Sequence, residues 1–493
     1  MTAMSPSILL IMILGVAVGI VFGSIPGLSA SMAVALFLPV TFGMDASTAM
    51  CLLVALYIGA ISGGLIAAIL LNIPGTPSSI ATCFDGHPMA QNGEAGKALG
   101  VGIVFSFIGG LFSFIILSFL APQIARVAIN FQAAENFSVC IFALTMIATL
   151  SAGNFLKGIL SGMLGLLCAC IGLAPVDNVA RYTFGMGELN NGFDILPTLI
   201  GIFAISEVLN LAETVNKMSK IKPMEIKKIK GFGFSLKEFK EQLPNAFRSA
   251  IIGTGIGILP GIGGSTSSIL AYVAAKKSSK TPEKYGTGYI GGIVASETAN
   301  NATIGGALIP LLALGIPGDG TTAMLLGAFM IHGLQPGPLL FKTSSDLVYV
   351  IFGACIIANF IMIIEEFGGI RIFIKLLSVP KHILMPIILV LCTVGAYANN
   401  RVMFDVVSVV IFGVVGYLMG KAKIPTAPFI LAFILGSNVE TYLRKALMNS
   451  RGSYATFVTS PISCVFLAIA VAVVVVCLAR EIMNVVKGSK KTA

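Results

Sequence analysis

Four Pro-Gly pairs, each soon followed by serine or threonine, have the residue types and spacing that could bind a small ion. The pairs are Pro26-Gly27, Pro74-Gly75, Pro260-Gly261 and Pro317-Gly318. Proline lacks a backbone N–H and glycine permits unusual dihedral angles, so each pair is expected to interrupt a helix. An interrupted helix leaves carbonyl oxygens, which suit Na⁺, and helix N-termini, which suit anions. For any single pair the alternative is an ordinary turn or kink.

The hydroxyl residues after these pairs stand where a helix would begin again. Each one alone could be only a helix N-cap. Together they would form a cradle of neutral hydrogen-bond donors for a carboxylate. We therefore treat them as candidate substrate-binding residues: Ser29, Ser31, Thr76, Ser78, Ser79, Ser265, Thr266, Ser267, Thr321 and Thr322.

Asn300 and Asn301 lie at the centre of an apolar, small-residue stretch from 288 to 314. Polar groups deep in a membrane span are costly and are functional candidates by default. An amide offers both a carbonyl and an NH₂ group, so the pair could coordinate a cation and bind a carboxylate. The alternative is a polar contact between helices. Asn301 and Asp319 are the candidate Na⁺ ligands, and Asp319 ranks lower because its charge would repel an anionic substrate.

The elements that must position these residues are membrane helices. The chain is 56% hydrophobic and only 11% charged, whereas soluble domains carry roughly a quarter charged residues. Apolar stretches such as Leu9 to Phe22, Ala98 to Leu120 and Val465 to Leu478 recur along it. With spans of about 20 residues, these stretches predict an all-α polytopic protein with about 11–13 membrane segments.

Charge and cysteine content exclude other classes. The net charge of +10 lies in loops, where the positive-inside bias explains it, so we do not infer nucleic-acid binding. The nine cysteines lack metal-site spacing. Nine basic residues between Lys217 and Arg248 predict a cytoplasmic loop. Arg444 and Lys445 fit the resulting topology poorly.

The two halves of the chain repeat one pattern. Gly19 to Phe42 and Gly63 to Ser79 correspond to Gly253 to Val273 and Gly305 to Ala323. An odd number of crossings separates them, which predicts two inverted-topology repeats with re-entrant hairpins and Pro-Gly-broken helices, an architecture typical of secondary transporters. The expected boundaries are a first repeat at 1–211 (hairpin 7–44, broken helix 47–95), a basic linker at 212–245, a second repeat at 246–480 (hairpin 247–275, broken helix 288–340) and a basic cytoplasmic tail at 481–493.

Two long blocks, Ile73 to Gly100 and Ser296 to Phe341, together with PGLSAS at 26–31 and PGIGGSTS at 260–267, carry a family resemblance. The chain resembles the large membrane subunit (TctA-type) of the tripartite tricarboxylate transporter family over nearly its whole length. One departure is Ser296, where the family pattern usually has proline.

The resemblance implies a non-enzymatic subunit of a bacterial inner-membrane symport system. Its partners would be a small membrane subunit (TctB-type) and a periplasmic solute-binding protein (TctC-type). The implied activity is uptake of citrate, another tricarboxylate or a related carboxylate, driven by a cation gradient that is typically sodium. No cofactor beyond this cation is expected.

Two alternatives differ from this reading. A self-sufficient secondary carboxylate/cation symporter would share the architecture without needing a binding protein. An intramembrane aspartyl protease built on Asp319 would need a glycine three residues earlier, where this chain has Ile316. We therefore do not expect an enzyme.

Overall fold

The computed structural model describes residues 5–150, 155–218, 232–376, 381–489 of the chain. The most basic part of the expected linker, at 219–231, and the end of the expected tail lie outside the described residues. By internal packing the chain forms two compact units. Unit 1 comprises Met1–Ala125 and Phe203–Arg401, and unit 2 comprises Arg126–Ile202 and Val402–Ala493.

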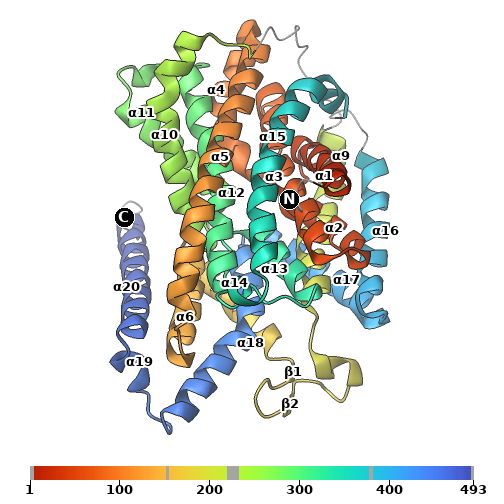
Figure 1. The fold of residues 1–493 in the computed structure, drawn as a ribbon, viewed down its shortest axis with the longest axis vertical. Helices are drawn as coiled ribbons and strands as arrows, with labels where there is room; N and C mark the ends of the chain where they lie inside the picture. The colour runs from red at the N-terminus through yellow and green to blue at the C-terminus, as the bar shows by residue number, and fades with distance from the viewer. Residues whose placement is uncertain (1–4, 151–154, 219–231, 377–380, 490–493) are drawn as a thin grey trace. The chain divides into compact units, whose positions relative to one another are not determined.

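Unit 1 holds the four Pro-Gly pairs that precede the candidate hydroxyl residues, and its helices are labelled in Figure 1. Its helices are α1 (Pro6–Ser24), α2 (Ala30–Phe37), α3 (Ala46–Leu71), α4 (Ile80–Met89), α5 (Ala95–Ala128), α9 (Ser206–Met218), α10 (Leu236–Ile258), α11 (Gly263–Ser278), α12 (Ile290–Leu314), α13 (Gly320–Ile331), α14 (Leu340–Thr343), α15 (Ser345–Leu376) and α16 (Lys381–Asn400). A 3₁₀ turn at Pro77–Ser79 leads into α4.

Unit 2 is also helical apart from one short strand pair. Its elements are α6 (Ala133–Leu150), α7 (Phe155–Ala169), β1 (Gly172–Leu173), β2 (Ala180–Arg181), α8 (Ile195–Ile200), α17 (Met403–Lys421), α18 (Thr426–Asn449), α19 (Thr456–Thr459) and α20 (Pro461–Ser489). The strands pair antiparallel, with Gly172 opposite Arg181.

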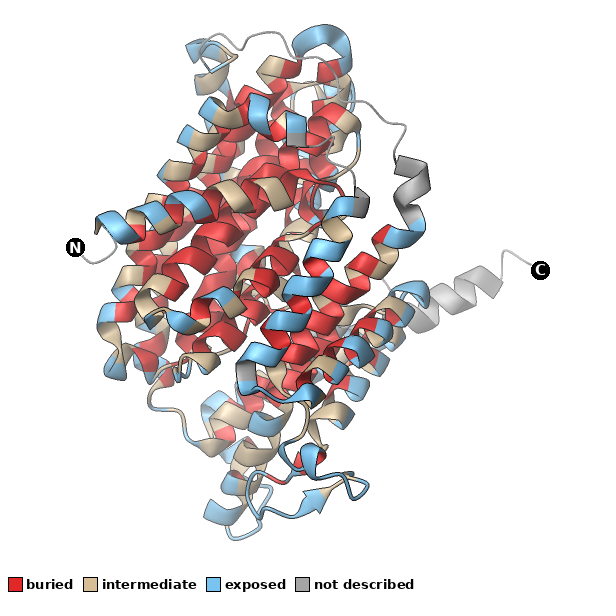
Figure 2. Cartoon of the chain, turned by 90° about the vertical axis from the view of Figure 1, so that its right-hand side faces the viewer, coloured by how far each residue is buried: buried red, intermediate tan, exposed pale blue. Residues whose placement is uncertain are grey.

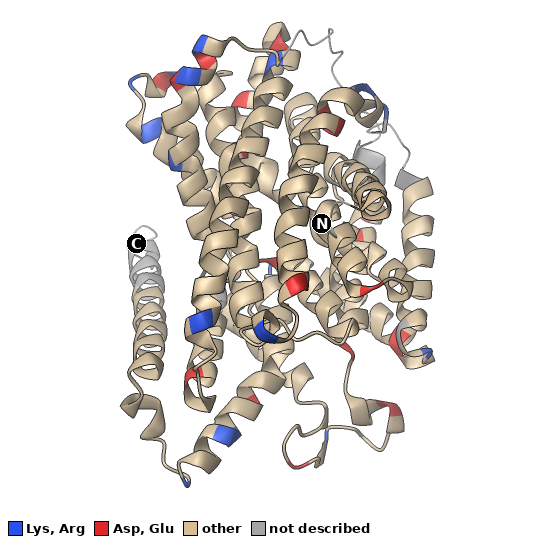
Figure 3. Ribbon diagram, viewed as in Figure 1, with Lys and Arg blue, Asp and Glu red and all other residues tan. Residues whose placement is uncertain are grey.

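Helix length and composition make this a multi-pass membrane protein. Within the described residues, 7 helical stretches are long and apolar enough to cross a bilayer. They are Pro6–Ser24, Ala46–Leu71, Pro77–Ala128, Ile195–Glu213, Ser345–Lys375, Met403–Lys421 and Pro461–Ala479. Charged side chains lie mostly near helix ends and in loops (Figure 3). The expected all-α membrane class is therefore confirmed.

Glycine allows two helix pairs of unit 1 to pack backbone against backbone. In the α1–α3 pair, a Cβ added at Gly23 would lie 2.0 Å from Ala60 O. In the α10–α12 pair, a Cβ added at Gly257 would lie 2.6 Å from Thr303 O. Such small-residue contacts are the usual way for membrane helices to associate, because lipid gives apolar side chains no reason to prefer protein.

We call Pro74-Gly75 the first break and Pro317-Gly318 the second break. The helices that lead into them, α3 and α12, are deeply buried. Every residue from Ala49 to Leu70 of α3 and from Ile290 to Ala313 of α12 is buried, and Figure 2 colours buried residues red. Each helix then ends at a residue in the left-handed conformation, Asn72 with φ 56° and Gly315 with φ 72°. Asparagine and glycine are the residues that adopt this conformation most readily. The chain thus stops both helices just before Pro-Gly.

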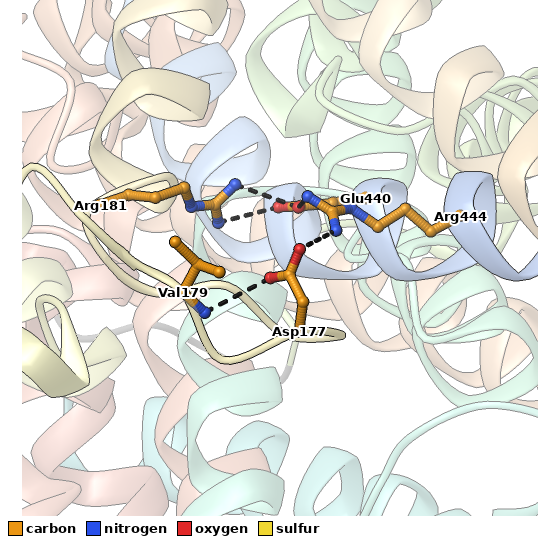
Figure 4. A network of polar contacts seen from close by, with 5 residues as sticks. All are labelled: Asp177, Val179, Arg181, Glu440 and Arg444. Carbon is orange, nitrogen blue, oxygen red and sulfur yellow. Dashed lines mark hydrogen bonds and ion pairs between the residues drawn. The ribbon is translucent and has the colours of Figure 1, made fainter.

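Two arginines near the strand pair of unit 2, Arg181 and Arg444, belong to one ion-pair network (Figure 4). Arg181 donates two hydrogen bonds of 3.0 Å to the Glu440 carboxylate. Arg444 pairs with Asp177 at 2.6 Å and with Glu440 at 2.8 Å. The Arg444 hydrogen bond holds the pKa of Asp177 below its usual value. Because two acids balance these two bases, Arg444 is a weak guide to membrane topology.

Candidate functional site

The tip of the first hairpin, between α1 and α2, lies against the second break, Pro317-Gly318. Ser31 Oγ at the start of α2 is 3.0 Å from Thr321 Oγ1 in the first turn of α13. A Cβ added at Gly320 would lie 3.2 Å from the same Ser31 Oγ. Two expected site residues, about 290 positions apart in sequence, therefore share one hydrogen bond.

The tip of the second hairpin, between α10 and α11, lies against the first break, Pro74-Gly75. Ser268 Oγ donates to the Ser78 carbonyl at 2.9 Å. A Cβ added at Gly264 would lie 2.9 Å from Ser78 Cβ and 2.8 Å from Asn300 Oδ1. The backbone of this tip therefore faces Asn300 and the residues after Pro74-Gly75.

Backbone contacts fix the Pro-Gly segments themselves. Gly261 N donates to Gly318 O at 2.7 Å, which joins the second hairpin tip to the second break. A Cβ added at Gly75 would lie 2.2 Å from Gly23 O, next to Pro26-Gly27. Gly27 and Gly261 both have positive φ, at 90° and 81°. At these positions a side chain would be either strained or obstructed.

Several of the expected site hydroxyls are occupied as helix caps or helix contacts. Ser29 Oγ accepts from Met32 N at 3.2 Å and caps α2. Thr76 and Ser79 form a capping box, and so do Asp319 and Thr322. Ser267 Oγ accepts from Thr303 Oγ1 at 2.8 Å, which ties α11 to α12. Ser29, Ser265 and Thr266 are half-buried, and the other expected site hydroxyls are buried: Ser31, Thr76, Ser78, Ser79, Ser267, Thr321 and Thr322.

Asp319 is held by protein donors on both carboxylate oxygens. Oδ1 accepts from Thr322 N at 2.7 Å and from Thr322 Oγ1 at 2.8 Å. Oδ2 accepts from the Tyr57 hydroxyl of α3 at 2.5 Å. Its first role is therefore to cap α13 and to join α13 to α3.

Asn300 and Asn301 are buried, and their amide groups are only partly satisfied. Asn301 Nδ2 donates to Ser106 Oγ at 2.8 Å, but its Oδ1 has no hydrogen-bond partner among the described residues. Neither amide atom of Asn300 makes a hydrogen bond of ordinary geometry there. Most buried polar groups are paired, so unpaired ones point to a ligand, water or ion. These oxygens are of the type that a hard cation binds.

Glu297 holds Asn301 in place through groups on three helices. Its carboxylate is fully buried and accepts from Thr82 Oγ1 of α4 and, at 3.0 Å, from Ser106 Oγ of α5. Ser106 in turn accepts from Asn301. Ser296, the departure from the family pattern, has its hydroxyl 3.1 Å from Thr82 Oγ1. The spacing of Glu297 one turn before Asn301 was visible in the sequence, but its partners were not.

Asp85 is a positioning residue that sequence patterns did not reveal. Its buried carboxylate accepts from the backbone N–H groups of Gly286, Gly288 and Tyr289 at 2.8–3.0 Å. It also accepts from the Tyr272 hydroxyl of α11 at 2.8 Å. This residue of α4 therefore fixes the segment that leads into α12.

One cavity in unit 1 is unsuited to a carboxylate. It measures about 400 Å³ and lies where α5, α15 and the start of α10 meet. Its lining is apolar except for one hydroxyl: Val104, Phe107, Ile108, Phe232, Phe234, Ser235, Leu236, Phe239 and Ile363. A carboxylate would lose its hydration there without gaining donors.

Comparison with known proteins decides the family. Residues 9–431 match the tripartite tricarboxylate transporter TctA family. The chain belongs to the TctA family. A protein of Agrobacterium vitis described as an uncharacterized 52.8 kDa protein in the TAR-I ttuC' 3' region is 34% identical over 484 residues. That alignment covers 98% of this chain and 95% of the relative.

A second A. vitis protein, described as an uncharacterized protein in the TAR-II ttuC' 3' region, is 35% identical over 232 residues. That alignment covers 47% of this chain and 96% of the relative. No solved structure matches this TctA-family chain. The family is that of a non-enzymatic membrane subunit of a tripartite tricarboxylate transporter, and by family its partners are of the TctB and TctC types.

Proposed function

We propose that this chain is the large transmembrane subunit of a bacterial inner-membrane system that takes up a tricarboxylate such as citrate, or a related carboxylate. Uptake is driven by a cation gradient, with Na⁺ as the coupling ion. A small membrane subunit and a periplasmic solute-binding protein complete the system. The observation that carries the proposal is the pair of buried asparagines with unpaired amide atoms, one of which, Asn300, faces the tip of the second hairpin.

The substrate part of the proposal rests on neutral donors near helix N-termini. Ser31 and Thr321 meet where α2 and α13 begin, and Ser78 lies beside the start of α11. Helix N-termini and hydroxyls bind a carboxylate without a fixed positive charge. Such binding is moderate, and release is correspondingly easy.

The cation part rests on Asn301 Oδ1, which is buried and has no hydrogen-bond partner among the residues that the structure describes. In our proposal Asn301 is the Na⁺ ligand, and Asp319 contributes only secondarily because protein donors occupy both of its oxygens. Within the described residues no three His, Cys, Asp or Glu side chains gather as a transition-metal site would require. An amide oxygen suits an alkali cation better than a transition metal.

We also propose that the two halves are inverted repeats, with the boundaries 1–211 and 246–480. Matched details support this. Both hairpins have a positive-φ glycine after proline, Gly27 and Gly261. Both breaks have a left-handed residue before Ile-Pro-Gly and a capping box after it. Inverted repeats place substrate and ion sites where broken helices meet.

The test is uptake of a labelled tricarboxylate into proteoliposomes that hold this chain and its small membrane subunit. We expect uptake only with an inward Na⁺ gradient and a carboxylate-loaded binding protein. Full-rate uptake without the binding protein would favour the self-sufficient symporter. Uptake that is indifferent to the Na⁺ gradient would refute the coupling ion.

A further inference from the structure

Glu366 of α15 is a buried carboxyl group outside the site described above. Its side chain has 0% exposure. Neither Oε1 nor Oε2 makes a hydrogen bond of ordinary geometry in the part of the chain that the structure describes. A buried polar group without a partner is uncommon, and a buried charge without a partner is costly by several kcal/mol.

Helix α3 is the element that faces Glu366. α15 packs along α3, and Ser62 of α3 lies close enough to interact with the Glu366 carboxyl. Ser62 Oγ is itself buried without a partner of ordinary geometry. Cys51 and Cys355, which also interact, stand eleven residues before Ser62 and Glu366 respectively. The two helices therefore run parallel and keep this face together over about three turns.

The charged side chains that the structure places near Glu366 are acids. Helices α1, α3 and α5 pack against α15. Helices α1 and α3 carry no charged residue between Pro6 and Ser24 or between Ala46 and Leu71. The basic residues of α5 are Lys97, which pairs with Glu238 at 2.6 Å, and Arg126 in its last turn. The charged groups that act on Glu366 are both acids, Glu297 of α12 and the neighbouring Glu365. Among the described residues no lysine or arginine forms an ion pair with it. Both of these neighbours carry the same sign of charge as an ionised Glu366.

A proton satisfies this environment better than a metal ion. A hard cation takes about six oxygen ligands, whereas the nearby uncharged groups of α3 offer one hydroxyl. A protonated carboxyl needs only one acceptor for its O–H, and Ser62 Oγ can accept. Protonation also removes the repulsion from Glu297 and Glu365.

We propose that Glu366 is a proton-binding site on the α3–α15 interface, and that its proton is carried in the transport cycle. The proton is held while α15 lies against α3. When water reaches the carboxyl, its O–H bond breaks, the electron pair stays on the carboxylate and the proton passes to water. The binding step stands on the geometry of Glu366 alone, and only its use in transport rests on the proposed function.

Infrared spectroscopy of the purified full chain tests proton binding directly. We expect the C=O stretch of a protonated carboxyl at neutral pH, lost in Glu366→Gln and kept in the matched control Glu365→Gln. Glu366→Asp retains a carboxyl and should shift the band rather than remove it, which guards against misfolding of the Gln variant. A spectrum unchanged by Glu366→Gln, or a band removed by saturating Na⁺ alone, would overturn the proposal.

Transport provides the second arm. At a fixed Na⁺ gradient, an acid exterior should raise carboxylate uptake several-fold in the wild type and in Glu365→Gln, but not in Glu366→Gln. Indifference of the wild type to the pH gradient would overturn the use of the proton in transport. If neither the wild type nor the two Gln variants take up carboxylate, the proposed function fails. The infrared band still shows whether Glu366 binds a proton.

Discussion

The two helices that end before Ile-Pro-Gly, α3 and α12, share their deep burial and their left-handed last residue but differ in their side chains. Both are buried along their length, and both end in a left-handed residue followed by a capped turn. Tyr57 stands eighteen residues before Gly75, and Asn300 stands eighteen residues before Gly318. The Tyr57 hydroxyl donates to Asp319, whereas neither amide atom of Asn300 makes a hydrogen bond of ordinary geometry among the described residues. The two helices therefore end alike, but only α12 carries buried amide groups with unpaired atoms among the described residues.

The largest expected effect comes from the asparagines of α12. Asn301→Ala should reduce cation-coupled uptake to background while membrane insertion stays intact, because a proposed cation ligand is lost. Tyr57→Phe on α3 removes one hydrogen bond to Asp319 and should cost less than about tenfold, equivalent to 1.4 kcal/mol. Both variants are measured by uptake, with size-exclusion chromatography to check the fold. Wild-type flux in Asn301→Ala would remove this residue from the site.

The next prediction tests whether the backbone is packed equally closely around Gly75 and around Gly318. A Cβ at Gly75 would lie 2.2 Å from Gly23 O, and a Cβ at Gly318 would lie 2.6 Å from Ala307 Cα. Gly75→Ala and Gly318→Ala should each destabilise the protein by about 1–3 kcal/mol, because backbone atoms must move. Thermal unfolding in detergent measures this. Gly43→Ala is the matched control, since a Cβ there meets nothing within 4 Å.

Proline substitutions ask whether the two breaks do equivalent work in transport. Pro74→Ala and Pro317→Ala should lower uptake in parallel and by several-fold, because each break shapes the turn that meets a hairpin tip. Uptake and cell-surface amount are measured for both variants. A loss confined to one of them would contradict the symmetry of the halves.

The smallest expected effects come from the N-cap residues after the two breaks. The cap after the first break, Thr76, is neutral, and the cap after the second break, Asp319, is an acid. Thr76→Ala should cost about 1 kcal/mol of stability because it removes an N-cap. Asp319→Ala should cost more, because it also leaves the buried Tyr57 hydroxyl without its acceptor. Asp319→Asn keeps a capping oxygen and should be nearly neutral in thermal unfolding. If Asp319→Asn instead weakens the Na⁺ dependence of uptake, Asp319 is a cation ligand as well as a cap.

The sequence predicted the helical membrane class and the family, because long apolar stretches and ordered motifs are local properties. It also singled out Ser31, Thr321, Ser78 and Asn300, which contact one another or the opposite hairpin tip in the structure. The Pro-Gly pattern marked these residues by position, but not their partners.

Partners formed by distant segments were beyond sequence reasoning. Asp85 binds the segment before α12 about 200 residues away, and Tyr57 meets Asp319 across 262 residues. Glu366 stands in a long apolar helix, where an acidic residue is a functional candidate by default, but its full burial and its neighbours appear only in the structure. Such contacts depend on tertiary packing, which a single sequence does not encode in any local spacing.

The glycine contacts between α1 and α3, and between α10 and α12, have a mechanical consequence. With backbone touching backbone, no side chain lies between the helices to rotate or compress. Each helix pair therefore moves as one rigid unit, so a movement of its hairpin tip also moves its Pro-Gly break. In the proposed transport cycle we therefore expect movement at helix interfaces that lack such backbone contacts.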